Sequence, residues 1–321
     1  MTPFSNNTYR RPAPASSALQ AHTSAGRQSS IANAHTPMPH TGYGSIIATP
    51  RYSNLISFTS PSGGIGLSTI TALVALTLSM QDIDCALLDA DIPHGGLGIL
   101  LGIEHEPGLS LQDIDAPLGR IDGKAFNLEL PHWEGINVLA CASWRGQLPE
   151  WWQMQAAIQA LCEANRMVLA DVGDGTVWEY VPELLMAQHV VAVELSVLGL
   201  ARAKAHLARL QRLRQELQGD DIDHPAPIVV FTEPRGAPKR SASSAIATTE
   251  AIAYLGGDAL GPIQHVPRLC ANILEGLGIE STPRCNRPTI EALSDRIMQS
   301  ANIQTRPGLG ETNHEAMPIT K

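Results

Sequence analysis

A glycine-rich segment followed by two hydroxyl residues is the part of the sequence best suited to chemistry. Residues 63–66 read Gly-Gly-Ile-Gly, follow an apolar run, and precede Ser68, Thr69 and a long apolar stretch of helical character. A strand, a glycine turn and a helix start together aim backbone N–H groups and the helix dipole at an anion. In the pattern G-x-x-x-x-G-K-[ST] a lysine precedes the hydroxyl residue, and here that position is Leu67. The segment predicts a phosphate-binding loop that lacks its lysine.

Two further apolar runs end in carboxylates. The first ends at Asp89 and Asp91, and the second ends at Asp171. Asp89 alone is well explained as a capping residue of a turn. Asp91 is placed to contact a metal-bound water or to orient an attacking one, whereas Asp171 matches a carboxylate that holds Mg²⁺ through water. Each motif by itself also fits an ordinary turn, but their order along the chain favours a common site.

Composition bounds the kind of protein that carries these motifs. The 321 residues are 44% hydrophobic and 17% charged, as in a packed soluble domain. A net charge of −9 argues against DNA binding by the whole surface. The five cysteines form no C-x-x-C pair, so neither a disulfide framework nor a metal framework is predicted. With no apolar run of about 18 residues and no hydrophobic signal core, we expect a cytoplasmic protein whose membrane contact, if any, is peripheral.

The distribution of apolar residues predicts one folded domain between two tails. Residues 1–51 and 302–321 are polar and lack apolar periodicity, so we expect both to be disordered. Residues 52–301 alternate short apolar runs with helical stretches, which is typical of parallel strands covered on both faces. The expected fold class is α/β, with a doubly wound, mostly parallel sheet flanked by helices.

The expected elements are as follows. Strands are predicted at Leu55–Thr59, Cys85–Ala90, Ile136–Ala140, Met167–Val172, Val190–Leu195, Ile228–Thr232 and Gly261–His265. Helices are predicted at Leu67–Met80, Gly96–Leu101, Glu150–Glu163, Tyr180–Met186, Leu200–Gln218 and Ser243–Leu255, with another around Ile290–Ile297. Ligands of such sheets sit beyond the carboxyl ends of the strands, where the glycine loop and the three carboxylates are expected to meet.

The motifs resemble those of the ParA/MinD superfamily of deviant-Walker ATPases, whose loop reads K-G-G-x-G-K-[ST]-[ST]. Ser62 and Leu67 stand where that pattern has its two lysines. The closest branch looks like the CpaE/TadZ group, and within it the actinobacterial septum-site-determining (Ssd) proteins. The residues that carry this finer resemblance are Asp89–Glu104, Pro107–Leu109, Leu118–Ile121, Leu130–Pro131, Gly135–Leu139 and Glu275–Gly276. A receiver-like domain, which relatives often carry, has no counterpart in the polar N-terminal stretch.

The resemblance implies a P-loop NTPase fold, ATP or ADP with Mg²⁺ as ligand, and nucleotide-dependent homodimers. It also implies a role at the septum or the cell pole, with division proteins or Flp/Tad-type pilus assembly proteins as partners. By motif, Asp91 corresponds to the switch I carboxylate, and Ser68 and Asp171 to the groups that hold Mg²⁺. The phosphate loop corresponds to Ser62, Gly63, Gly64, Ile65, Gly66, Leu67, Ser68 and Thr69. The two lysine roles correspond to nothing in this sequence.

The missing lysines point to weak or absent ATP hydrolysis. Loss of one preorganised electrostatic donor costs on the order of 10²–10³ in rate, and the first lysine in the chain is Lys124. Arginines 120, 145, 235 and 268 fall in predicted loops, and Arg145 is the candidate replacement cation, although a solvated surface arginine is the simpler interpretation. Three functions stay open: a degenerate nucleotide-binding localisation protein, which we favour, an active ATPase with another cation, and, least favoured, a DNA-partitioning protein.

Two weaker predictions concern the rest of the chain. Residues 200–217 form an amphipathic helix with leucines on one face. Its basic stripe, Arg202, His206, Arg209 and Arg212, is expected to be a solvated face, with contact to anionic lipid, an acidic partner or DNA as the alternative. Adenine contacts are expected in the loops near Thr232 and Pro267.

Overall fold

The computed structural model describes residues 51–116, 119–142, 148–218, 224–234 and 246–302. These residues form a sheet whose strand order is β3-β4-β2-β5-β1-β6-β7-β8. Neighbouring strands are parallel except for the short edge pair β3 and β4. The strands are β1 (Leu55–Thr59), β2 (Cys85–Asp89), β3 (His132–Trp133), β4 (Ile136–Leu139), β5 (Met167–Asp171), β6 (Gln188–Glu194), β7 (Ile228–Thr232) and β8 (Ala259–Ile263).

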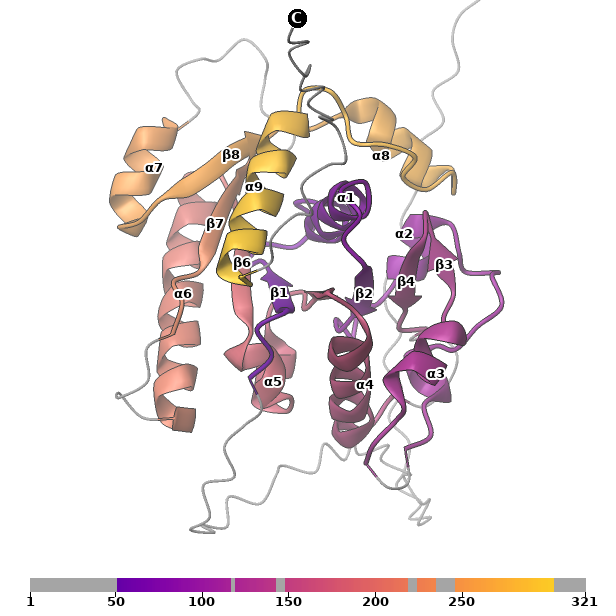
Figure 1. Ribbon diagram of the computed structural model, residues 1–321. Coiled ribbons are helices and arrows are strands. Elements are labelled where there is room, and N and C mark those ends of the chain that lie inside the picture. The colour runs from indigo at the N-terminus through magenta and orange to yellow at the C-terminus, as the bar shows by residue number, and fades with distance from the viewer. Residues whose placement is uncertain (1–50, 117–118, 143–147, 219–223, 235–245, 303–321) are drawn as a thin grey trace, which may run out of the picture. The chain divides into compact units, whose positions relative to one another are not determined.

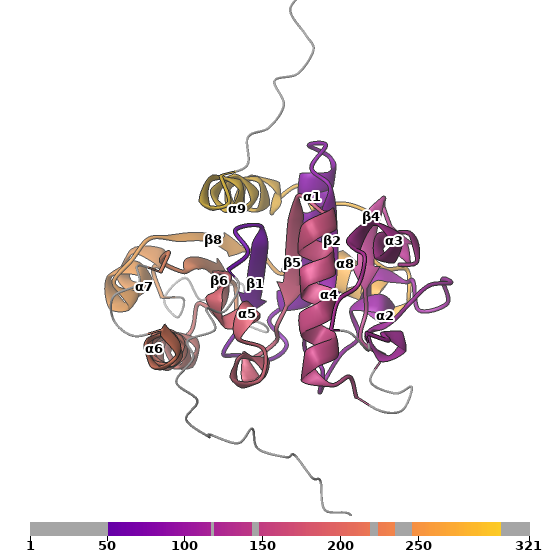
Figure 2. The ribbon, with the colours of Figure 1, turned by 60° about the horizontal axis from the view of Figure 1, so that its bottom comes forward.

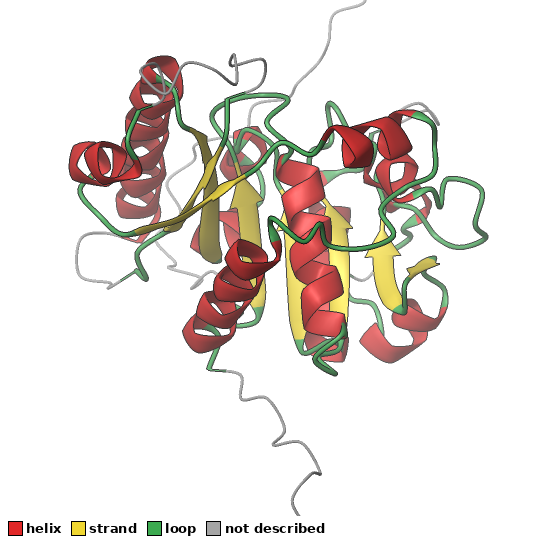
Figure 3. Ribbon diagram, turned by 90° about the horizontal axis from the view of Figure 1, so that it is seen from above, coloured by secondary structure: helices red, strands yellow, loops and turns green. Residues whose placement is uncertain are grey.

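Helices cover both faces of this sheet. On one face α1 packs against α9, and on the other α3 packs against α4, and α5 against α6. Figure 2 shows α9 on the opposite side of the strands from α5 and α6, and Figure 3 shows the strands as one layer between helices. The helices are α1 (Leu67–Ser79), α2 (Leu97–Leu101), α3 (Gly123–Leu128), α4 (Trp151–Ala164), α5 (Pro182–Met186), α6 (Val197–Gln218), α7 (Thr248–Leu255), α8 (Pro267–Leu274) and α9 (Arg287–Ser300), with 3₁₀ turns η1 (Leu111–Asp113) and η2 (Thr176–Glu179).

The alternation of strand side chains explains the two apolar layers. Ile56 and Phe58 of β1 point to the layer under α1 and α9, whereas Leu55 points to the layer under α4 and α5. All five residues of β1, β2 and β5 are buried. A strand that is buried on both faces reads as a near-continuous apolar run, and these three strands do so apart from Ser57, Thr59 and the two terminal aspartates. The core therefore holds the ends of β1, β2 and β5, and with them the candidate site, at fixed positions.

The predicted fold class is confirmed, and several element boundaries are corrected. Strands β1 and β7 have the predicted bounds, but β8 begins two residues before the predicted Gly261 and ends at Ile263. Strand β3 and helices α3 and α8 have no counterpart among the predicted elements. Helix α8 was missed because Pro267, its first residue, suggested a loop, although proline is well tolerated at the first helical position.

Several sequence predictions fall largely outside the described residues. The expected disordered tails, 1–51 and 302–321, reach the described part only at Arg51 and Asn302, so their boundaries stay predictions. The candidate cation Arg145 and the loop arginine at 235 are also outside it. In the part of the chain that the structure describes, no helix is both long enough and apolar enough to span a membrane.

Candidate functional site

The predicted phosphate loop joins β1 to α1 at the carboxyl end of the sheet. Gly64 has a φ of 72° and Gly66 a φ of 92°, a region that favours glycine. Gly66 is the residue from which α1 begins, and a side chain at Gly63 or Gly66 would meet no atom within 4 Å. The first amides of a helix have no intrahelical acceptor. The loop therefore presents open backbone, with free first-turn amides behind it, to any anion that enters.

A cleft of about 840 Å³ opens over this loop. Its size suits a small-molecule ligand, since such sites typically measure about 300–1,000 Å³. Asp91, Asp171 and Asp174 face it from the loops after β2 and β5, and residues of the β8–α8 segment close its far side. The predicted residues that line it are Ser62, Gly63, Gly64, Gly66, Leu67, Ser68, Thr69, Asp91 and Asp171. Of the predicted site only Ile65 is absent from the lining; it packs against the apolar layer under α1 and borders an adjoining hollow.

Ser68 and Asp171, the two residues predicted to hold magnesium, lie in contact. Asp171 is buried at the end of β5, and the Ser68 hydroxyl donates a hydrogen bond to its carboxylate. Burial raises the pKa of Asp171 to about 6, against the opposing effect of that hydrogen bond. Magnesium bound to a nucleotide takes most of its ligands from phosphate oxygens and water, and needs only one or two protein groups. A hydroxyl beside a buried carboxylate therefore fits the ion.

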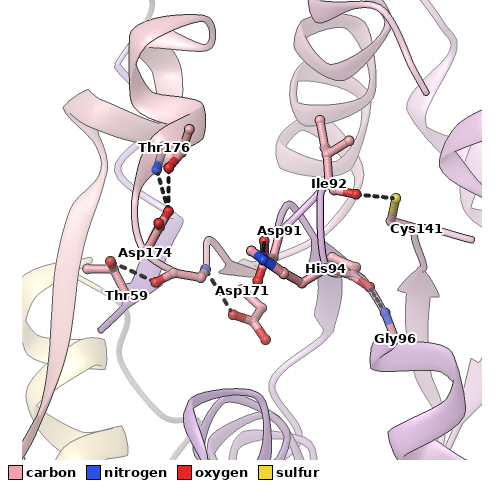
Figure 4. A network of polar contacts seen from close by, with 11 residues as sticks. Thr59, Asp91, Ile92, His94, Gly96, Cys141, Asp171, Asp174 and Thr176 are labelled. Carbon is pink, nitrogen blue, oxygen red and sulfur yellow. Dashed lines mark hydrogen bonds and ion pairs between the residues drawn. The ribbon is translucent and has the colours of Figure 1, made fainter. Parts of the chain in front are cut away.

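Asp91 is held directly against the loop that follows β5. Its backbone carbonyl accepts hydrogen bonds from the amides of His94 at 3.1 Å and Gly95 at 2.6 Å, which closes a tight turn. Gly173 has a φ of 61°, and a Cβ built there would lie 2.5 Å from the Asp91 carboxyl carbon. The two loops thus touch at Gly173, where a side chain would strain the backbone and displace the Asp91 carboxylate. Figure 4 shows Asp91 and His94 beside Asp171.

Asp89 has the structural role that its position in a turn suggested. Its Oδ2 accepts hydrogen bonds from the amides of Gly96 and Leu97, both at 3.0 Å, and so caps the start of α2. Burial, more than the nearby Asp171 and Asp91, raises its pKa to about 7, although the backbone hydrogen bonds act in the other direction. Asp89 therefore does not line the cleft, and it stabilises the loop that carries Asp91 through these two hydrogen bonds.

The loop after β5 is tied to the loop after β1. The carbonyl of Gly173 accepts hydrogen bonds from the Thr59 hydroxyl at 3.0 Å and from the Ser60 amide at 2.9 Å. Asp174 then accepts from the Thr176 amide at 2.9 Å and its hydroxyl at 2.6 Å, the turn role predicted for it (Figure 4). Burial raises the pKa of Asp174, but the hydrogen bonds from Thr176 outweigh it and hold the pKa below its usual value.

The solvated basic stripe predicted on α6 is wrong at His206, and Arg209 is only partly exposed. His206 is buried, with Nε2 3.1 Å from the Thr59 hydroxyl, and burial lowers its pKa to about 4. Arg209 pairs with Glu179 at 2.9 Å and lies over the Trp178 ring. Only Arg202 and Arg212 remain exposed, and Arg212 lies 3.7 Å from Glu216. Thr59 of β1 contacts His206, and Glu179 and Trp178 of η2 contact Arg209. Helical periodicity alone cannot reveal such tertiary partners.

Among the described residues, no arginine or other lysine takes the place of the missing lysine. The described residues that line the cleft include neither type. Arg268, expected in a loop, is on α8 and outside the lining, and Arg120 lies 3.6 Å from Glu163 instead. The described residues also contain no cluster of three or more His, Cys, Asp and Glu side chains able to hold a metal ion.

A smaller hollow of about 60 Å³ adjoins the cleft where adenine contacts were expected. It is lined by Thr232 and, in place of Pro267 itself, by the preceding Val266. His265 and Cys270 line both spaces, so the two adjoin along the β8–α8 segment. The expected adenine region therefore lies next to the phosphate loop.

The polar residues of the cleft that were not predicted from the sequence include His94, His265 and Cys270. His94 lies in the Asp89–Gly95 motif, three residues after Asp91, and this spacing could have identified it. His265 and Cys270 depend on α8, whose position over the cleft no local pattern indicates. The Nδ1 of His265 lies 3.7 Å from the Cys270 sulfur.

Comparisons with solved structures place this sheet and loop in a known fold. The chain superimposes on MinD in the MinC:MinD cell division complex of Aquifex aeolicus with a TM-score of 0.57, covering 84% of this chain and 99% of that one at 16% identity. It matches a ParA family ATPase of Chlorobium tepidum with a TM-score of 0.57, covering 78% and 99% at 20% identity. The fold is that of MinD and ParA.

Sequence comparisons agree over part of the chain. A MinD-type septum-site-determining protein of Tupiella akineta is 26% identical over 164 residues, 50% of this chain and 53% of that protein. An ATP-binding protein of Methanocaldococcus jannaschii is 27% identical over 169 residues, 51% and 61%. An uncharacterized protein of Mycobacterium tuberculosis is 37% identical over 78 residues, 24% and 21%. No family model matches. The matches span about half of the two longer-matched relatives and about a fifth of the third, and with the fold they support homology to MinD/ParA-family ATPases.

Proposed function

We propose that this chain is a degenerate MinD/ParA-like protein that binds ATP or ADP with Mg²⁺ and hydrolyses ATP weakly or not at all. One observation carries the proposal. The glycine loop, Ser68 and Asp171 face a nucleotide-sized cleft, while Leu67 stands at the lysine position and the described lining contains neither lysine nor arginine. The names of two relatives, an ATP-binding protein and a ParA family ATPase, support the choice of ligand.

The proposed role is to position or regulate septum or Flp/Tad pilus machinery, as in the CpaE/TadZ/Ssd branch. Septum placement is supported by the similarity to a septum-site-determining protein. The Aquifex relative is seen with a division partner, MinC, which supports a protein partner for this chain. We further propose a homodimer that works at the cytoplasmic face of the membrane, with peripheral contact only. DNA partitioning is disfavoured by the net charge of −9.

Calorimetry and a turnover assay on the full chain test the proposal together. We expect ATP with Mg²⁺ to bind, and turnover to lie on the order of 10²–10³ below that of the Chlorobium ParA family ATPase assayed alongside, because one preorganised cation is missing. Turnover close to that of the reference, and abolished by Asp91→Ala, would instead establish the alternative, an active ATPase with a non-standard cation. Failure of both ATP and ADP to bind would show that the nucleotide interpretation is wrong.

Cys270 offers a direct test of where the nucleotide sits. Burial raises the pKa of Cys85 to about 12 and that of Cys141 to about 11, and raises that of Cys162 further, so these thiols react slowly. Cys270 and Cys285 are the accessible thiols, and of the two only Cys270 lines the cleft.

ATP with Mg²⁺, at a concentration about ten times its Kd, is therefore expected to slow alkylation of Cys270 about tenfold, because only the unbound fraction reacts. Peptide mass spectrometry measures the rates at both thiols, and Cys285 is the internal control, whose rate should not change. Equal rates at Cys270 with and without a nucleotide that binds would place the ligand elsewhere.

A further inference from the structure

The cleft has a deficit of positive charge for a polyphosphate ligand. Three carboxylates face it, those of Asp91, Asp171 and Asp174, and the described lining contains no lysine or arginine. The start of α1 and the loop amides contribute only partial positive charge. Mg²⁺ offsets only part of the negative charge of a bound triphosphate, and a charged donor near its terminal groups strengthens the binding further. The described side chains of the lining that can carry such a charge are His94 and His265.

His94 is the better placed of the two. It lies on the loop between β2 and α2, and its side chain is 75% exposed. Its Nδ1 lies 2.9 Å from Asp91 Oδ1, a contact that fixes the ring and leaves Nε2 free of that bond. The His265 amide donates to Glu233 at 3.3 Å, and its ring is turned to Cys270. His94 thus combines a held ring with an exposed edge at the cleft.

We propose that His94, as an imidazolium braced by Asp91, makes the phosphate contact for which this loop has no lysine. This inference rests on the proposed nucleotide binding and adds the residue that supplies the charge. It also gives the site a property that a lysine-bearing loop lacks. Lysine stays charged across the neutral range, whereas histidine does not. Affinity for a polyphosphate should therefore depend on pH near neutrality.

The direction of that dependence follows from the groups around His94. The hydrogen bond and charge of Asp91 raise its pKa most, burial acts against them, and the charge of Asp174 adds a smaller rise. The imidazolium therefore persists to a higher pH than in a free histidine side chain and is lost as the pH rises through this raised pKa. Asp171, His265 and Cys270 also line the cleft. Protonation of Asp171, whose pKa burial raises to about 6, would favour an anion in the same direction, so variants of His94 are needed to separate the two.

Inorganic tripolyphosphate without divalent cation is the probe, with ATP and Mg²⁺ titrated in parallel into the full chain. We expect wild-type affinity to be about tenfold higher at about pH 6 than at about pH 8.5, since one charge-assisted hydrogen bond contributes about that factor. His94→Gln should lose about tenfold at the lower pH and most of the pH dependence. His94→Lys should keep the high affinity at the higher pH. His132→Gln, a change at an exposed histidine on β3 outside the cleft, should behave as wild type.

The outcomes separate this inference from the proposed function. If ATP binds and His94→Gln leaves both the affinity and its pH dependence unchanged, the role of His94 is refuted while nucleotide binding stands. If neither probe binds the wild type at either pH, both proposals are refuted. Because His94 is exposed, its variants should melt at the wild-type temperature, and circular dichroism checks this before the titrations.

Discussion

Replacing Leu67 with lysine is expected to raise the affinity for ATP with Mg²⁺ by about ten- to a hundredfold, the contribution of hydrogen bonds to charged groups. Leu67 is the first residue of α1, is half-buried and lines the cleft, and although it packs at the edge of the apolar layer under α1, the long stem of lysine can keep part of that contact. An ammonium group there would face Asp91 and Asp171 when the cleft is empty and phosphate oxygens when it is filled. Calorimetry measures the gain.

Leu67→Met is the matched control, because it keeps an apolar side chain of similar volume and adds no charge. Its affinity should equal that of the wild type. The lysine variant should also lose most of its dependence on His94, so that adding His94→Gln costs it less than it costs the wild type. An unchanged affinity in Leu67→Lys, with an unchanged melting temperature, would mean that another feature than the missing charge limits nucleotide binding.

The sheet could be predicted because its strands are local features of the sequence. The runs 55–59 and 228–232 are mostly apolar and β-branched or aromatic, and they form β1 and β7 with the predicted bounds. Strand β8 was predicted two residues too late, because its start is set by the pairing of Ala259 and Leu260 with β7, which no local pattern shows. The two-residue β3 is too short to leave a pattern, and it exists because it pairs with β4.

The residues of the candidate site likewise fall into those that local sequence predicts and those that tertiary contacts decide. The glycine loop, Asp91 and Asp171 lie at or just after strand ends, and the carboxyl ends of parallel strands share one edge of the sheet, so the sequence predicts that they meet. The contact of His206 with Thr59 joins residues 147 positions apart, and the packing of Arg209 on Trp178 is a tertiary contact as well. Both contacts override the period of α6, which is why His206 of the expected solvated stripe is buried and Arg209 is only partly exposed. Helix α8 closes the cleft for a similar reason, since its apolar side chains find partners only in the folded chain.

Trp178 is the residue whose loss should destabilise the fold most. Its side chain is fully buried, its ring lies 5.1 Å from that of His189 and 5.0 Å from that of His206, and Arg209 covers it. Gly175 fits against the same ring, since a Cβ there would come within 2.7 Å of it. Trp178→Ala is expected to lower the free energy of unfolding by about 3–5 kcal/mol, the usual cost of emptying a buried aromatic site. Urea denaturation followed by circular dichroism measures it.

Trp178→Phe is the matched variant, because a smaller ring keeps part of the packing against both histidines. It should cost clearly less than the alanine variant, in proportion to the smaller cavity. The position also joins the core to the site, since η2 follows directly from Asp174 and Gly175. The alanine variant should therefore weaken nucleotide binding as well, through the loop that carries Asp171 and Gly173. A loss of less than about 1 kcal/mol, below the range of buried aromatic sites, would contradict the packing described for this ring.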